Sequence, residues 1–236
     1  MGVVQADPGL LSPFQHITFD VRGERNLRNG VADLTADVVA LMEHLGIRKT
    51  HLLGTSLGGF VAQELALERP DLLDRLILLC TSYGRAGPEN ISPWAMKDMI
   101  GWPSLSIEGA VRCGLETATS EAYRTERPEE FEEIVRWRLA DSSSLSAYYQ
   151  QMRAGVRFDA SRDVGVITSP TLVIHGANDR YVPVANAAAL SEAIPDAKLR
   201  VFDDAGHLIF IERFAEVNRE VVTFLKLFQA RKRRAA

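Results

Sequence analysis

The first part of the chain alternates between short apolar runs and stretches with helical spacing. Strands are predicted at His16–Val21, Thr50–Leu53 and Arg75–Thr81, and a helix at Val31–Leu45, where apolar residues recur every three or four positions. A second helical stretch separates the last two strands and ends near Pro70. Strands that alternate with helices predict right-handed crossovers and a mostly parallel sheet.

The pattern changes between Gly84 and Arg162, where the β-branched runs stop. Helices are predicted there at Trp94–Ile100, Ile107–Thr119, Pro128–Ala140 and Leu145–Val156. We interpret this segment as a helical cap over the carboxyl edge of the sheet. Its aromatic residues form the core of the cap or line an apolar substrate pocket; they are Trp94, Trp102, Phe131, Trp137, Tyr148, Tyr149 and Phe158.

The strand pattern returns near the end of the chain. Strands are predicted at Thr171–His175 and Lys198–Phe202, and helices at Ala185–Ala193 and Phe214–Ala230. The predicted fold is therefore α/β, with a mostly parallel, doubly wound sheet and a helical cap insert. We expect residues 1–86 and 163–236 to form the core and residues 87–162 to form the cap.

Composition excludes several classes of protein. The net charge of −4 gives no electrostatic support for binding nucleic acid, and no apolar stretch is long enough to cross a bilayer. The chain carries no signal-peptide pattern, and its two cysteines, Cys80 and Cys113, make no disulfide framework, so a cytoplasmic location is expected. No residues have metal-ligand spacing, and no glycine-rich phosphate loop is present.

A Gly-x-Ser-x-Gly sequence, Gly54 to Gly58, lies between the strand at Thr50–Leu53 and the helix after it. This setting is typical of a nucleophile elbow, a sharp turn that lifts the Ser56 hydroxyl out of the sheet. The glycines are expected because a Cβ at Gly54 or Gly58 would collide with the neighbouring strand or helix. The alternative is an ordinary glycine-rich turn between a strand and a helix.

Three residues with complementary chemistry each follow a predicted strand directly: Ser56, Asp179 and His207. The carboxyl ends of parallel strands meet at one edge of a sheet, so these loops are expected to converge. A serine hydroxyl needs a base to become a nucleophile, imidazole suits that role, and a carboxylate fixes the imidazole tautomer.

Other residues could take part in such a site. Asp203 and Asp204 are alternatives for orienting His207, but a carboxylate so close along the chain would have to fold back onto its own loop. His175 ends a strand beside the predicted site and is expected to be structural. Cys80 is expected to be a small buried apolar residue.

Four segments resemble the α/β-hydrolase family, in particular capped, cofactor-free members such as 3-oxoadipate enol-lactonases, small esterases and non-haem perhydrolases. They are FDVRG, LLGTSLGG, SPTLVIHGANDRYVP and DDAGHLIFIERF, and the resemblance extends from about Phe19 to Leu225. The order Ser, Asp, His along the chain is also that of the family. The resemblance implies that Ser56 is the nucleophile, Asp179 the acid, His207 the base and the Leu57 N–H one oxyanion donor. Serine at position 56 argues against the dehalogenase and epoxide-hydrolase branches, which use aspartate there.

The amino-terminal segment departs from the family pattern. Family members carry three strands and a His-Gly loop before the strand that FDVRG resembles, and residues 1–16 are too few to hold them. Gly23-Glu24-Arg25 also differs from the usual Gly-x-Gly or Gly-x-Ser. We therefore expect the first strands, and the loop that supplies a second oxyanion N–H, to be missing. Either His16–Val21 or Val3-Val4 is expected to lie beside Thr50–Leu53 instead.

The predicted function is that of a serine hydrolase that cleaves a small carboxylic ester or lactone through an acyl-enzyme, with an apolar or aromatic acyl group. This mechanism needs no cofactor and no metal, and the sequence predicts no oligomeric state. The alternatives are a non-catalytic ligand- or partner-binding protein on a hydrolase scaffold, and C–C bond hydrolysis or perhydrolysis with the same three residues.

Overall fold

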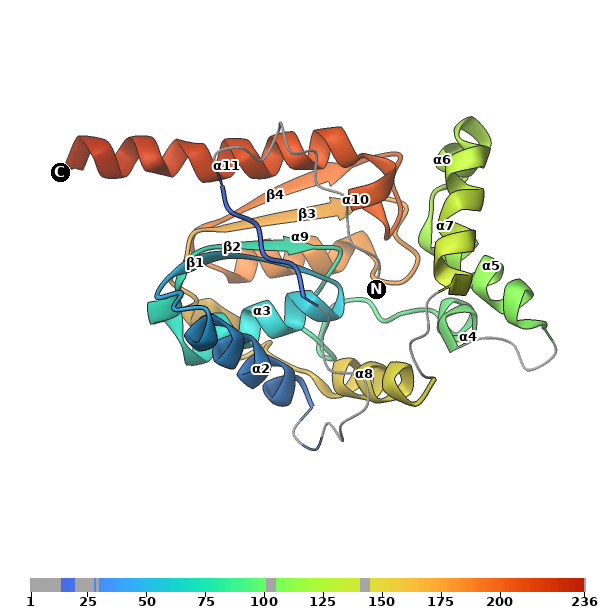
Figure 1. Ribbon diagram of the computed structural model, residues 1–236, viewed down its shortest axis with the longest axis horizontal. Coiled ribbons are helices and arrows are strands. Elements are labelled where there is room, and N and C mark those ends of the chain that lie inside the picture. Colours follow the sequence, from blue (N-terminus) through green and yellow to red (C-terminus); the bar gives the residue numbers. More distant parts are fainter. Residues whose placement is uncertain (1–13, 20–27, 29, 101–104, 141–144, 236) are drawn as a thin grey trace.

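A parallel sheet of four strands organises the described part of the chain (Figure 1). The computed structural model describes residues 14–19, 28, 30–100, 105–140 and 145–235. The strands are β1 (Thr50–Thr55), β2 (Leu73–Leu79), β3 (Thr171–Gly176) and β4 (Ala197–Phe202), and they lie side by side in that order. The fold is α/β, as the alternation of strands and helices predicts.

Helices cover both faces of the sheet. The principal ones are α2 (Val31–His44), α3 (Leu57–Glu68), α9 (Val184–Ala193) and α11 (Phe214–Ala235). Leu76 and Leu78 of β2 belong to the buried cluster formed with α2, α3 and α9, whereas Ile77 and Leu79 pack with α11 on the opposite face. Side chains alternate between the faces of a strand, so the continuous apolar run of β2 is explained by burial on both faces.

Five helices lie between β2 and β3 in the sequence and form the helical insert. They are α4 (Pro93–Ile100), α5 (Ile107–Ala118), α6 (Glu121–Glu126), α7 (Pro128–Ala140) and α8 (Leu145–Arg157). Figure 1 shows α4 to α7 beyond the carboxyl ends of the strands, while α8 contacts α3. The short α6 is missing from the sequence prediction; its two signals are the N-cap Ser120 and the proline that begins α7.

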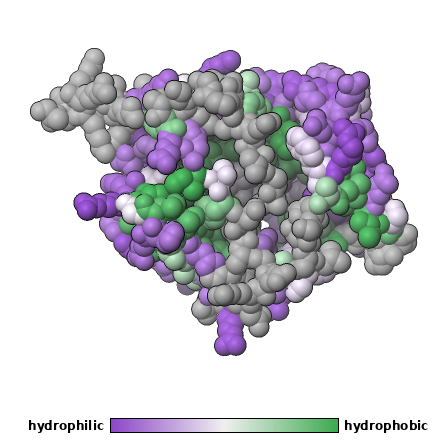
Figure 2. Space-filling model, viewed as in Figure 1, coloured by the Kyte–Doolittle hydropathy of each residue, from purple (hydrophilic) through white to green (hydrophobic). Residues whose placement is uncertain are grey.

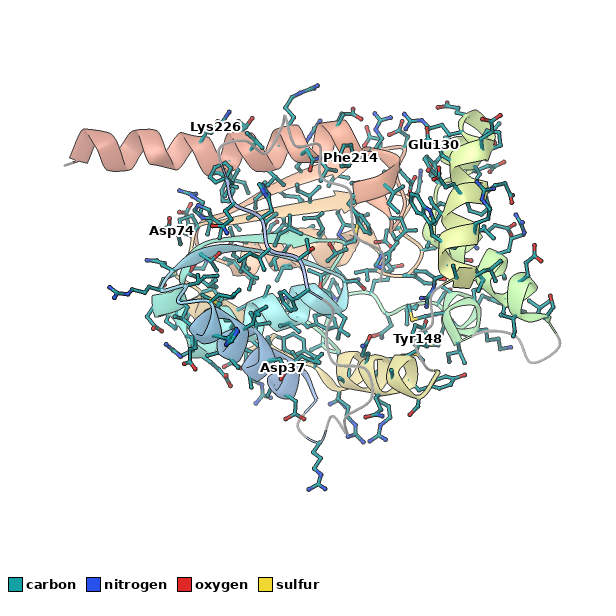
Figure 3. All side chains as sticks on the ribbon, viewed as in Figure 1. Asp37, Asp74, Glu130, Tyr148, Phe214 and Lys226 are labelled. Atoms are coloured by element: carbon teal, nitrogen blue, oxygen red, sulfur yellow. The ribbon has the colours of Figure 1, made fainter. Side chains whose placement is uncertain are left out.

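The insert has a small core of its own. Tyr123, Phe131, Ile134 and Val135 form a buried cluster. The hydroxyl of Tyr148, which is labelled on α8 in Figure 3, donates a hydrogen bond to the Met99 carbonyl at 2.6 Å. Hydrophobic side chains also reach the surface over α5, where Ile107 is 81% exposed (Figure 2).

The shorter elements connect these layers. They are the 3-10 turns Pro70–Leu72 and Val164–Val166, and the one-turn helix α10 (Ile209–Glu212), which follows the loop after β4. None of the described helices has the length and hydrophobicity needed to span a bilayer.

The prediction of a strand at His16–Val21 is wrong for the residues that the structure describes. Residues 16–19 form no strand, and Ile17 and Phe19 are both more than 40% exposed. β-branched and aromatic residues favour a strand, but a strand needs a neighbour that completes its hydrogen bonds. The expected pairing of this segment with β1 is therefore not formed by residues 16–19, and Val3-Val4 lies outside the described residues.

Candidate active site

Ser56 occupies a strained turn between β1 and α3. Its φ of 53° and ψ of −117° lie in a region of backbone conformation that residues other than glycine rarely adopt. Two hydrogen bonds hold this backbone: the Ser56 N–H donates to the Leu79 carbonyl, and the Thr81 hydroxyl donates to the Ser56 carbonyl, both at 2.9 Å. The turn therefore has the geometry of the predicted nucleophile elbow.

Two glycines make the close approach at this turn possible. A Cβ on Gly54 would lie 2.1 Å from the Gly58 carbonyl oxygen, and a Cβ on Gly59 would lie 2.6 Å from the side chain of Thr81. The expected collision at Gly58 is wrong, because a Cβ there would meet nothing within 4 Å. Gly58 contributes its backbone to the contact with Gly54, and Gly59 is the second position that requires glycine.

Leu57 begins α3 immediately after Ser56. The first N–H groups of a helix have no acceptor within the helix and carry its positive dipole end. The Leu57 N–H therefore has no acceptor within its own helix.

Asp179 and His207 form a buried hydrogen-bonded pair. His207 Nδ1 lies 2.7 Å from Asp179 Oδ2, and Asp179 Oδ1 accepts the backbone N–H groups of Tyr181 and Val182 at 2.9 and 2.8 Å. Burial alone raises the pKa of Asp179, but the electrostatic interaction with His207 and the hydrogen bonds from His175 and His207 outweigh burial, so this pKa lies well below its usual range. The carboxylate is thus held ionised with both oxygens occupied.

His175 also contacts this carboxylate. The Nε2 atom of His175 lies 3.3 Å from Asp179 Oδ2 and 2.7 Å from the Val182 carbonyl oxygen, and the ring is completely buried. A carbonyl can only accept, so the proton of a neutral His175 ring lies on Nε2 and faces both acceptors. From the sequence, His175 is predicted only to have a structural role at the end of a strand. The feature that could have predicted its contact with Asp179 is its position near the end of β3, four residues before that aspartate.

The loop that carries His207 packs closely against the end of β3. A Cβ on Gly176 would lie 2.3 Å from the Ala205 carbonyl oxygen and 2.4 Å from that of Gly206. The ring of Tyr181 meets His207 edge to face, with centroids 5.4 Å apart. These contacts place the His207 ring beside the loop that carries Asp179.

Cys80 lies beneath this pair and is fully buried, as expected. Ligand atoms of Cys80, Asp179 and His207 lie within 4.8 Å of one another. Burial raises the pKa of the Cys80 thiol well above its ordinary value, and the neighbouring Asp179 carboxylate adds to this rise. Asp179 and His207 already bond to each other, and we assign no metal to this group.

The two alternative carboxylates lie away from His207. Asp203 and Asp204 are both exposed, and Asp204 Oδ2 accepts a hydrogen bond from Arg213 at 3.1 Å. The structure therefore brings Asp179, rather than either of its rivals, to His207. Within the described part of the chain, the hydroxyl of Ser56 forms no hydrogen bond; in free enzymes such contacts are often long and tighten when substrate binds.

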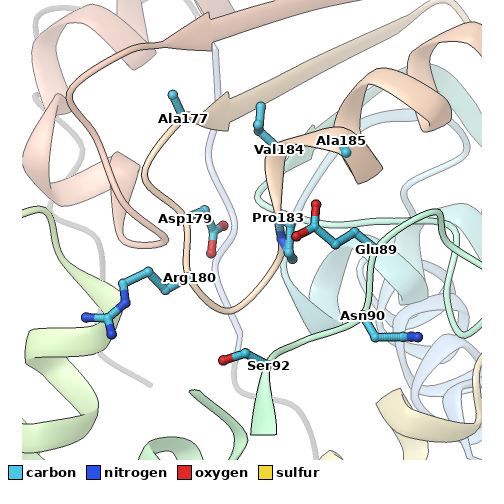
Figure 4. Close-up of a pocket in the computed structure, with 9 residues that line it drawn as sticks. All are labelled: Glu89, Asn90, Ser92, Ala177, Asp179, Arg180, Pro183, Val184 and Ala185. Carbon is cyan, nitrogen blue, oxygen red and sulfur yellow. The ribbon is translucent and has the colours of Figure 1, made fainter. Parts of the chain in front are cut away.

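A cavity of about 390 Å³ opens beside Asp179 (Figure 4). Its walls come from the segment before α4, with Glu89, Asn90 and Ser92, and from the loop between β3 and α9, with Asp179 and Arg180. Its polar lining differs from the aromatic pocket expected of the insert.

Some aromatic residues of the insert are buried and others are exposed. Phe131 and Phe158 are buried in hydrophobic clusters, whereas Trp94, Trp137 and Tyr149 are exposed. Trp102 lies outside the described residues.

Comparisons with known proteins show the family to which the chain belongs. The chain is 30% identical over 197 residues to the 2-hydroxy-6-oxo-6-phenylhexa-2,4-dienoate hydrolase of Comamonas testosteroni, covering 80% of this chain and 67% of that protein. The enol-lactonase of Burkholderia xenovorans superposes with a TM-score of 0.75 at 26% identity, covering 88% of this chain and 79% of that one. A hydrolase of Pseudomonas aeruginosa gives a TM-score of 0.74 at 28% identity, covering 87% and 77%. Residues 7–220 match the alpha/beta hydrolase family, and the chain belongs to that family.

Proposed function

We propose that this hydrolase cleaves a small carboxylic ester or lactone by acyl transfer through Ser56, His207 and Asp179. The observation that carries the proposal is the 2.7 Å hydrogen bond between Asp179 Oδ2 and His207 Nδ1, on the sheet edge where the strained turn presents Ser56. A histidine oriented through Nδ1 leaves Nε2 available as the base for the serine.

In this mechanism the oxygen of Ser56 attacks the carbonyl carbon, and its proton passes to His207. The negative charge formed on the carbonyl oxygen is stabilised by the Leu57 N–H at the start of α3. The tetrahedral intermediate collapses, the leaving oxygen takes the proton from His207, and an acyl-enzyme remains. Water then attacks the acyl carbon while His207 takes its proton. The bond between the acyl carbon and the Ser56 oxygen breaks, His207 returns the proton to that oxygen, and the acid is released.

Asp179 stabilises the imidazolium that forms in each step. It stays ionised, because its low pKa reflects the donors that surround it. The Asp179 carboxylate accepts the backbone N–H groups of Tyr181 and Val182, and His175 Nε2 lies 3.3 Å from its other oxygen. We therefore propose that His175 helps to position this carboxylate.

We propose that the helical insert, α4 to α8, acts as a cap over the site. The cavity beside Asp179 is bounded on one side by the segment that leads into α4. A cap of this kind excludes water from the reacting groups and selects the substrate.

A second candidate reaction is hydrolysis of a carbon–carbon bond next to a ketone. It is favoured by the relative from Comamonas testosteroni, which is named for a 2-hydroxy-6-oxo-6-phenylhexa-2,4-dienoate substrate. The enol-lactonase of Burkholderia xenovorans favours the lactone reaction. The same serine, histidine and aspartate serve both reactions, so substrate assays separate them.

The test compares wild type, Ser56→Ala and Ser191→Ala on three substrates: p-nitrophenyl butyrate, a γ-lactone and 2-hydroxy-6-oxo-6-phenylhexa-2,4-dienoate. Ser191 is a matched control, because among the described residues its hydroxyl bonds only to the Ala188 carbonyl of its own helix. We expect turnover of an ester or lactone that Ser56→Ala abolishes and Ser191→Ala retains. Turnover of the dienoate alone would favour the second reaction, and turnover that survives Ser56→Ala would refute both.

A further inference from the structure

Glu212, at the end of α10, is a buried carboxylate with no part in the mechanism above. Its side chain is only 2% exposed. One oxygen accepts the backbone N–H of Gly206 at 3.0 Å, and the other accepts the backbone N–H of Ser120 at 3.1 Å. Gly206 immediately precedes His207, and Ser120 lies between α5 and α6 of the helical insert. A single carboxylate therefore joins the insert to the loop of the predicted catalytic base.

Further contacts hold the helical insert against the His207 loop and α10. The Leu208 N–H donates to the Ala118 carbonyl at 3.0 Å, so the residue after His207 also bonds to the end of α5. Ile211 of α10 packs against the buried cluster of the insert. A Cβ on Gly206 would lie 2.8 Å from the Ala118 carbonyl oxygen and 3.0 Å from Glu212. The glycine is needed because the two segments approach so closely.

Both backbone polar groups of Gly206 have a partner. Its N–H bonds to Glu212, and its carbonyl accepts the Cys80 thiol at 3.9 Å. The backbone just before His207 is thus held by Glu212 of α10 and by Cys80, which directly follows β2.

A buried carboxylate depends on its donors. Burial raises the pKa of Glu212, and the hydrogen bonds from Ser120 and Gly206 oppose that rise. Removing one donor leaves a buried oxygen without a partner, and relaxation of either segment would follow. Because one of these donors belongs to the His207 loop, such relaxation moves the imidazole.

We propose that Glu212 is a positioning residue that couples the helical insert to His207, keeping the imidazole in place against Asp179 only while the junction of α5 and α6 is docked. This inference rests on the proposed function for its effect on catalysis. Its structural part, the dependence of the His207–Asp179 hydrogen bond on Glu212, does not require turnover.

The first test is Glu212→Gln, which keeps the shape but replaces one acceptor oxygen with a donor amide. Glu132→Gln is the matched control, because Glu132 is a half-exposed carboxylate of the insert that pairs with Arg112. We expect Glu212→Gln to slow labelling of Ser56 by a fluorophosphonate about tenfold or more, since hydrogen bonds to charged groups are the stronger ones. The control is expected to react like wild type.

The second test acts from the insert and leaves Glu212 unchanged. Ser120 has φ −68° and the preceding Thr119 is extended, so the backbone at position 120 accepts proline. Proline removes the N–H and the hydroxyl, and its Cδ takes the place of the amide hydrogen that bonds to Glu212, so the contact with the carboxylate is broken. Ser120→Ala removes the hydroxyl, which caps α6 by accepting the Tyr123 N–H, and keeps the N–H to Glu212. We expect Ser120→Pro to slow labelling and Ser120→Ala to leave it near wild type. This pair keeps the test decisive if Glu212→Gln does not fold.

The downfield proton NMR signal of His207 Nδ1–H distinguishes a positioning role of Glu212 from a merely structural one. This signal is assigned by its absence in His207→Gln. In folded Glu212→Gln and Ser120→Pro we expect this signal to shift upfield or disappear, with thermal unfolding still cooperative. An unchanged signal and labelling rate in both variants would overturn the coupling. If wild type itself is not labelled, the proposed function fails, and the NMR signal alone still decides the role of Glu212.

Discussion

His207 Nδ1 lies 2.7 Å from Asp179 Oδ2, although 28 positions separate the two residues in the sequence. The parallel sheet explains this proximity. β3 and β4 are neighbours, and the loops after them leave the sheet at the same edge. The other oxygen of Asp179 accepts two backbone N–H groups, so these contacts hold the carboxylate independently of the histidine.

Asp179→Asn is expected to leave the fold intact and to reduce the labelling or turnover rate by about 10³–10⁴, because an amide favours the wrong imidazole tautomer. Asp204→Asn is the matched control, since Asp204 is exposed and bonds to Arg213. Rates measured with the same substrate should separate the two variants. Loss of activity in Asp204→Asn with retention in Asp179→Asn would reassign the acid.

The pH dependence of stability should report the same carboxylate. The pKa of Asp179 is lower in the folded protein than the value of about 3.9 expected in the unfolded chain. Its stabilising contribution is therefore fully present above the unfolded pKa and is lost as the pH falls toward the folded pKa. Urea unfolding between about pH 6 and pH 2.5 should show a steeper loss of stability for wild type than for Asp179→Asn. Parallel curves would contradict this assignment.

The strain at Ser56 predicts a difference between two inactive variants. Both Ser56→Ala and Ser56→Gly remove the hydroxyl, but only glycine adopts the φ of 53° without strain. We expect Ser56→Gly to have the higher free energy of unfolding, by about 1 kcal/mol, after allowing for the greater entropy of glycine in the unfolded chain. Equal stabilities in chemical denaturation would mean that the turn is unstrained.

The glycines of the elbow offer a similar contrast. Gly54→Ala places a Cβ 2.1 Å from the Gly58 carbonyl oxygen and is expected to cost about 3 kcal/mol or more, or to prevent folding. Gly58→Ala meets nothing within 4 Å and lies in α3, where alanine is favoured by up to about 1 kcal/mol. Thermal unfolding measures both, and a stable Gly54→Ala would show that the β1–α3 turn is looser than described.

Much of this architecture is predictable because the signals are local. Apolar periodicity predicts α2, α3 and β2 to within a few residues, and the residue types after three strands predict Ser56, Asp179 and His207 as a group. The sheet then brings Asp179 and His207 together, since strand order determines which loops meet.

The errors involve interactions that the sequence does not display. A strand at residues 16–19 would need a neighbouring strand, and no periodicity shows whether one is available. Which glycine of the elbow is crowded depends on where the Gly58 backbone and Thr81 lie in space. The hydrogen bond between Glu212 and Ser120 links residues 92 positions apart, and no periodic pattern in the sequence predicts it. The one local feature that points to it is a glutamate within an apolar stretch.

Fluorophosphonate labelling of the native protein tests directly whether Ser56 is an activated nucleophile. The modified residue is mapped by mass spectrometry beside a denatured sample and Ser56→Ala. We expect one label, on Ser56, in the native sample only. A folded protein that shows no label, or carries it on another residue, would contradict the proposed nucleophile and favour a ligand-binding role for this scaffold.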